Sequence, residues 1–195
     1  MAKEFFGFFD SISDDEREYD AEEFAHILRA SMRNGITSHA ENGLRVVQDG
    51  SSLRTKVTPG GCVINGYLYV LSDDGGEWMN FEHVAAVGSQ RWDRIVARLD
   101  KRVDARRISL KLLVGVSGQD APALTRNDYV YEISLAKVCV RPGATAISAT
   151  DIVDERMDEN LCGAAVPVWL TGDKLGQQFT VESITNAEID AMMNA

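Results

Sequence analysis

The stretch Arg91-Trp92-Asp93-Arg94-Ile95-Val96-Ala97-Arg98-Leu99-Asp100 decides the fold class of this chain. Ile95, Ala97 and Leu99 fall on one face of an extended segment, and Val96 falls on the other. Successive side chains of a β-strand point to opposite faces, so this period of two predicts a strand. The sequence therefore indicates a β protein, and the segments on either side extend the pattern.

The same period of two continues in both directions along the chain. Strands are predicted at 44–48, around Leu53, Thr55 and Val57, at 62–71, 84–87, 91–100 and 108–115, and at 129–140, the longest of them. Turn signals separate them at 59–61, 73–76 and 142–143, and Asn65-Gly66 breaks 62–71 as a tight hairpin or a bulge. Helices do not alternate with these strands, so we expect an antiparallel β-sandwich or barrel-like sheet.

An amphipathic helix is predicted before the strands. Asp20 is a suitable N-cap, and Glu23 completes a capping box three residues later. Its apolar stripe comprises Phe24, Ile27, Leu28 and Met32. Asn34-Gly35 is expected to end the helix, with Gly35 in the left-handed position after the C-cap.

A second, short helix is predicted near the C terminus. Residues 185–188 form another capping box, and Ile189, Met192 and Met193 follow it. A helix this short is marginal alone in water, so it needs a surface to pack on, and that surface could belong to another subunit. Residues 166–170 could form a further strand.

These patterns divide the chain into three parts. Residues 1–40 hold an aromatic segment and the amphipathic helix, residues 41–165 the antiparallel β domain, and residues 166–195 the tail with its short helix. The aromatic segment contains Phe5, Phe6, Phe8 and Phe9. Four aromatic side chains near a terminus need burial, either in this protomer or in a neighbour, which makes them candidate interface residues together with Ile189, Met192 and Met193.

Composition excludes several classes of partner. The 20 basic and 30 acidic residues give a net charge of -10, which repels the phosphates of nucleic acids. No apolar run approaches the roughly 20 residues of a membrane span, and no signal peptide is recognised at the start. We therefore expect a soluble protein that is made in the cytoplasm.

No known catalytic or metal motif is found. The chain lacks GxSxG, P-loop, GxGxxG and HExxH patterns, and its histidines, His26, His39 and His83, lie far apart. Cys62, Cys139 and Cys162 lack zinc or disulfide spacing and are expected as small buried side chains. The acidic runs at 14–16, 73–74 and 151–159 could supply a glycosidase pair or calcium ligands, but such carboxylates are usually solvated. We expect no enzyme activity, no cofactor and no metal.

The charged residues of the 91–100 strand have three interpretations. They could form modest cross-strand ion pairs on a polar face. Arg91, Asp93 and Arg94 could instead form a network that fixes the sheet register, since the arginine fork binds carboxylates with two bonds. Arg91, Trp92, Asp93 and Arg94 could also contact a ligand or partner.

The order of several short segments resembles tail and baseplate proteins of siphophages and prophages of Gram-positive bacteria. The matching segments are 8–11, 17–21 with Phe24, 34–36, 57–60, 64–67, 91–96, 98–100, 122–126, 131–136, 143–145, 152–156 and 162–163. Each is short, and their collinear order over residues 5–165 carries the resemblance. The related regions resemble the N-terminal parts of baseplate upper or tail-fibre-like proteins, which attach to the tail and present a receptor-binding part.

This resemblance implies a structural protein of the phage tail, assembled in the bacterial cytoplasm and located in the virion. Because few residues follow Cys162-Gly163, we expect an adaptor that links the tail to receptor-binding components. Its partners would be other tail or baseplate proteins, and it would be a homo-oligomer related to a trimer or hexamer. The alternative is a carbohydrate-binding module that contacts host cell-wall glycans through Trp78, Trp92 or Trp169. A third hypothesis is a glycan-degrading tail enzyme.

Overall fold

A computed structural model describes residues 7, 9–37, 43–72 and 78–168 of the chain. Within them lie α1 (Ala21–Ser31), β1 (Gly35–Ile36), β2 (Val46–Gln48), β3 (Arg54–Val57), β4 (Gly60–Ile64), β5 (Tyr67–Leu71), β6 (Met79–Glu82), β7 (Arg91–Asp100), β8 (Arg107–Leu113), β9 (Val130–Val140), the 3-10 helix η1 (Ala149–Asp151) and β10 (Ile152–Asp154). The prediction of a mainly β protein with an N-terminal helix is confirmed. The predicted C-terminal helix lies outside the described residues.

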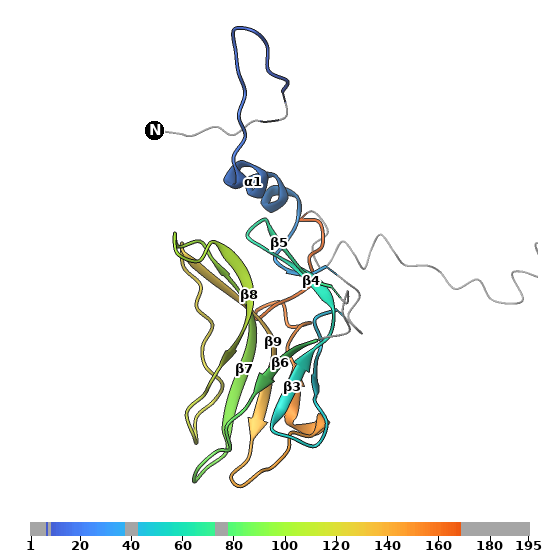
Figure 1. The fold of residues 1–195 in the computed structure, drawn as a ribbon, viewed down its shortest axis with the longest axis vertical. Coiled ribbons are helices and arrows are strands. Elements are labelled where there is room, and N and C mark those ends of the chain that lie inside the picture. Colours follow the sequence, from blue (N-terminus) through green and yellow to red (C-terminus); the bar gives the residue numbers. More distant parts are fainter. Residues whose placement is uncertain (1–6, 8, 38–42, 73–77, 169–195) are drawn as a thin grey trace, which may run out of the picture.

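The strands form three antiparallel sheets around one apolar core. Their orders are β10-β9-β7-β8, β1-β4-β5 and β2-β3-β6, and Figure 1 shows the two small sheets beside the four-stranded one. Fully buried core residues come from all three sheets and from the segment before β2, among them Leu44, Val57, Ile64, Ile95, Leu135 and Val138. This packing encloses the apolar faces that the period of two predicted.

The strand that decides the fold class, β7, lies at the centre of the largest sheet. It pairs with β8 on one edge and with β9 on the other, and its register with β9 shifts between Ile95 and Val96. Ile95, Val96 and Ala97 are all fully buried, although consecutive side chains point to opposite faces. Both faces of β7 are therefore covered, which explains why its charged side chains need partners inside the protein.

Helix α1 lies at the end of the β4–β5 hairpin (Figure 1). Its capping box forms as predicted: Asp20 Oδ1 accepts from the Glu23 backbone N–H, and Glu23 Oε2 accepts from the Asp20 N–H, each at 2.9 Å. Ala25 is the residue of α1 that is buried. The predicted apolar stripe is instead open to solvent, with Phe24, Ile27 and Leu28 exposed by 51%, 41% and 37%. The spacing of apolar residues identifies one face of the helix, but it does not show that another part of the same protomer packs on that face.

Two local predictions are wrong, and one alternative is decided. Gly35 does not follow the helix C-cap, which is Met32; it lies in β1, where an added Cβ would fall 2.3 Å from the Gly163 carbonyl oxygen. Residues 84–87 form no strand, and Val84 and Val87 are exposed; the strand is instead β6, whose residues pair with β3. The segment 65–66 is a tight hairpin turn, with φ of 50° at Asn65 and 81° at Gly66, as a type I′ turn requires.

Candidate functional site

The carboxylate of Asp93 organises a buried polar network on one face of β7. Oδ1 accepts bonds from Arg91 Nε at 2.7 Å and from the Gly115 N–H at 2.9 Å, and Oδ2 lies 2.8 Å from His83 Nδ1. Burial by itself raises the pKa of Asp93, but the bonds from His83, Arg91 and Gly115 outweigh it and hold the pKa below its usual value. Asp93 is therefore ionised inside the core, with Arg91 as its counter-charge.

His83 extends this network to Thr55, which lies on β3. The distance from His83 Nε2 to Thr55 Oγ1 is 3.0 Å. A hydroxyl, an imidazole and a carboxylate in series are the parts of a hydrolytic triad. Here Thr55 and Asp93 are fully buried and His83 is 4% exposed, so no substrate reaches the hydroxyl. The arrangement ties the β2-β3-β6 sheet to β7 and does not present a nucleophile.

The side chains of Arg94 and Arg98 lie on the opposite face of β7. Arg94 donates to Pro122 O at 2.5 Å and to Glu155 Oε1 at 3.3 Å, and Ser134 Oγ donates to Glu155 Oε2 at 2.5 Å. Arg98 Nε donates to Oε1 of the fully buried Glu132 at 2.6 Å. The structure thus brings Arg91 and Asp93 together, as the network interpretation expected, while Arg94 joins a separate group on the other side of the strand.

Segments that lie far apart in the sequence contact one another in the fold. Gly35 packs against Gly163, and Arg126 donates to the carbonyls of Asn160 and Leu161, each at 2.8 Å. Glu155 joins the segment 152–156 to 91–96 and 131–136 through the bonds described above. These residues hold the β domain together, and several of them are far apart in the sequence.

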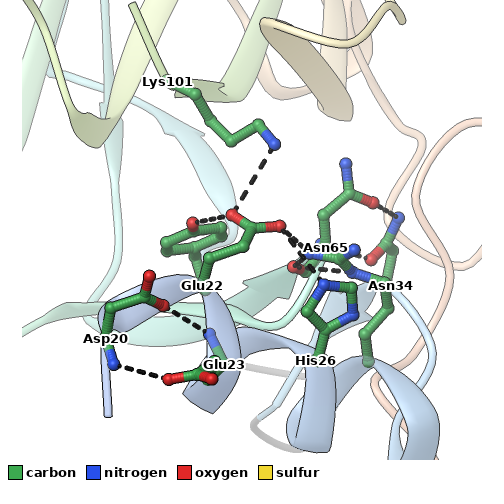
Figure 2. Close-up of polar contacts among 9 residues, drawn as sticks. Asp20, Glu22, Glu23, His26, Asn34, Asn65 and Lys101 are labelled. Atoms are coloured by element: carbon green, nitrogen blue, oxygen red, sulfur yellow. Dashed lines mark hydrogen bonds and ion pairs between the residues drawn. The ribbon is translucent and has the colours of Figure 1, made fainter. Parts of the chain in front are cut away.

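Glu22 attaches α1 to the β domain (Figure 2). Its carboxylate accepts the Tyr67 hydroxyl at 2.5 Å and Arg29 at 3.0 Å, and Lys101 Nζ approaches to 3.8 Å. The bonds from Tyr67 and Arg29 lower the pKa of Glu22 to about 2. Burial, together with the bond to Glu22, raises the pKa of Tyr67 to about 12. His26 is half-buried, and its Nε2 lies 3.9 Å from Glu22 Oε1.

Asn34, which follows α1 in the sequence, binds the hairpin turn at Asn65 (Figure 2). Asn34 Nδ2 donates to Asn65 Oδ1 at 3.0 Å, and the Asn65 N–H donates to Asn34 Oδ1 at 2.7 Å. Arg29 donates to the Asn65 carbonyl from Nε at 3.2 Å. Helix and hairpin are therefore held as one rigid unit.

This helix–hairpin unit exposes large apolar side chains. Besides Ile27 and Leu28 on α1, Leu68 and Val70 on the outer face of β5 are 61% and 63% exposed. Phe9, a predicted interface residue, is 61% exposed, while Phe5, Phe6, Phe8, Ile189, Met192 and Met193 lie outside the described residues. Large exposed apolar side chains that gather on one part of a protein commonly mark a binding site, which makes this unit a candidate.

Among the remaining candidates for chemistry, the acidic residues 14–16 are exposed, and residues 73–74 lie outside the described residues. In the acidic run 151–159, Asp151, Asp154 and Glu155 pair with Arg141, Arg156 and Arg94, respectively. The three cysteines are free and buried. Across the described ranges, no group of three or more His, Cys, Asp or Glu residues could hold a metal ion. In that same part of the chain, no helix has the length and apolar character needed to cross a membrane.

The tryptophans considered for sugar binding are half-buried where they are described. Lys56 Nζ lies 4.7 Å from the ring centroid of Trp78, and Lys137 Nζ lies 5.0 Å from that of Trp92. A lysine therefore covers one face of each ring. Trp169 lies outside the described residues.

Together these features define an antiparallel β domain with internally paired charges and an apolar surface on a rigid helix–hairpin unit. No family model, curated protein sequence or solved structure matches the chain.

Proposed function

We propose that this chain is a structural protein of a phage or prophage tail. It acts as an adaptor in the baseplate or adsorption apparatus, linking the tail to receptor-binding components in the virion. The observation that carries the proposal is the exposed apolar surface of α1 and β5, represented by Ile27, Leu28, Leu68 and Val70.

The rigidity of this surface favours a binding role. Glu22 and Asn65 each make several bonds that fix α1 on the hairpin, so a partner would lose little free energy in ordering it. Acidic residues at 14–16, 18, 20, 22 and 23 precede the apolar side chains of α1 in the sequence. Charged residues close to an apolar surface fit the usual composition of a protein interface, in which the outer part is polar.

The resemblance described above indicates the class of assembly, which is a phage tail. Its segments meet within the fold, as expected of residues that specify a structural domain. Tail organelles are built with closed symmetry, so we extend the proposal to a homo-oligomer related to a trimer or hexamer.

The test mixes the purified chain with each product of the neighbouring tail genes and measures mass by chromatography with light scattering. We expect a stable complex with one of them, which Ile27→Asp abolishes. Val87→Asp is the matched control, because Val87 is an 85% exposed apolar side chain outside the helix–hairpin unit. A monomer that binds none of these proteins would overturn the proposal.

A further inference from the structure

A pocket of about 740 Å³ lies between the start of α1, β5, the β7–β8 turn and the two residues just before β9. This volume is in the range of small-ligand sites. Leu99 and Ile108 contribute apolar lining, and polar side chains line much of the rest. The pocket is separate from the buried Asp93 network.

The pocket has unpaired positive charge. Two of its carboxylates are already bound by arginines outside its lining: Glu22 by Arg29, and Asp100 by Arg102. Arg106 and Arg107 also line the pocket, and neither forms an ion pair with any residue that the structure describes. Lys101 also lines the pocket, but its Nζ lies 3.8 Å from Glu22, so its charge is paired (Figure 2). Asp128 is the third carboxylate of the lining, so Arg106 and Arg107 leave an excess of positive charge that suits an anion.

The backbone of Arg106 supports a role for its side chain. Its φ is 44°, in the left-handed region that glycine or asparagine adopts at lower cost. Its N–H donates to the Arg102 carbonyl at 3.0 Å and closes the turn. Residues in sparsely populated backbone regions cluster at ligand sites as well as in tight turns, which fits a place for Arg106 in this pocket.

The other side chains suit a hydroxylated ring. Tyr129 is 66% exposed on the pocket wall and offers a flat aromatic face. Asp128, beside it, has a carboxylate that can accept bonds from hydroxyl groups. Arginine forks bind carboxylate or phosphate groups with two parallel bonds.

We propose that this pocket binds an anionic saccharide. Arg106 and Arg107 contact the acidic group, Tyr129 packs against the ring, and Asp128 accepts its hydroxyls. The site is distinct from Trp78 and Trp92, and it does not depend on the adaptor role.

Isothermal titration of the full chain tests the proposal. The probes are trigalacturonic acid and glucose 6-phosphate, whose anionic groups differ, with neutral galactotriose and inorganic phosphate for comparison. We expect one anionic sugar to bind, and both Arg106→Gln/Arg107→Gln and Tyr129→Ser to weaken it, the arginine pair by about tenfold or more. Arg33→Gln/Arg45→Gln is the matched control, since it removes the same charge outside the pocket and should bind as the wild type does.

Several outcomes would overturn the proposal. These are no binding of either anionic sugar at millimolar concentration, equal binding of galactotriose, or wild-type affinity in the arginine double variant. Inorganic phosphate binding as tightly as the sugar would also overturn it, because the ring would then contribute nothing. Thermal unfolding of each variant confirms that it is folded. Complex formation through the Ile27 surface is measured separately, so the two proposals fail independently.

Discussion

Gly66 lies directly against the backbone of Ala25, and a Cβ added to Gly66 would come within 1.9 Å of the Ala25 carbonyl oxygen. Helix α1 therefore rests on the hairpin turn at a contact that only glycine allows. Gly66→Ala should displace the helix and lower the free energy of unfolding by about 2 to 3 kcal/mol, from steric overlap added to the strain at φ of 81°. Urea denaturation measures the loss.

The matched control for this substitution is Gly50→Ala. Gly50 also has a left-handed φ, of 64°, but an added Cβ would meet nothing within 4 Å. The Gly50→Ala variant should therefore lose only about 1 kcal/mol of stability, from backbone strain alone. Equal losses in the two variants would show that the contact with Ala25 does not constrain the helix.

The attachment of α1 should depend on pH through Glu22. Its folded-state pKa of about 2 lies below the ordinary 4.5, so it stabilises the fold above pH 4.5 and loses that effect as the pH falls toward 2. Because the Glu22 side chain is 39% exposed, solvent screening reduces the expected contribution to about 1 kcal/mol. The difference in unfolding free energy between wild type and Glu22→Gln should therefore shrink across this window.

The same pH series can also contradict this prediction. If wild type and Glu22→Gln differ by the same amount at pH 6 and pH 2.5, the carboxylate of Glu22 does not hold the helix in place. Glu18→Gln, an acidic neighbour that precedes the helix, provides a control for the loss of one negative charge.

Asp93→Asn should be among the most destabilising single substitutions in the chain. It removes the counter-charge of the buried Arg91 and changes the partner of His83, and breaking a buried ion pair typically costs about 3 kcal/mol or more. The exposed Asp104, replaced by Asn, should change stability by less than about 0.5 kcal/mol. Similar midpoints of denaturation for the two variants would contradict a structural role for the network.

The sequence predicted the elements whose signals are local. The period of two in residues 91–100 identified β7 at its observed bounds, and the Asp20–Glu23 capping box placed the start of α1. The prediction of a strand at 84–87 was wrong because the apolar residues there have a composition typical of strands. The strand is β6, which is formed by less apolar residues that pair with β3. Cross-strand pairing, and not composition, decides that strand.

The candidate sites were less predictable, because they depend on contacts between distant segments. Thr55, His83 and Asp93 meet only once the β2-β3-β6 sheet packs against β7, and no spacing in the sequence indicates this. Arg106 and Tyr129 reach one pocket because a turn and the start of β9 lie side by side. The apolar stripe of α1 could be recognised in the sequence. Its exposure could not be predicted, because the spacing of apolar residues does not show what covers that face of the helix.

The three cysteines should react slowly in the native protein. Burial raises the pKa of Cys62 and of Cys162 to about 12, and burial also raises that of Cys139. A pKa of 12 in place of 9 leaves a thiolate fraction on the order of a thousandfold smaller at pH 8, and the thiolate is the reactive form. Labelling with a disulfide reagent, followed by peptide mass spectrometry, should find Cys62 and Cys162 unmodified in buffer and all three modified in 8 M urea. Cys139, which is 6% exposed and less strongly shifted, should react before the other two. Rapid native labelling of Cys62 or Cys162 would show that the core between β4 and the segment after β10 opens readily, contrary to the packing described here.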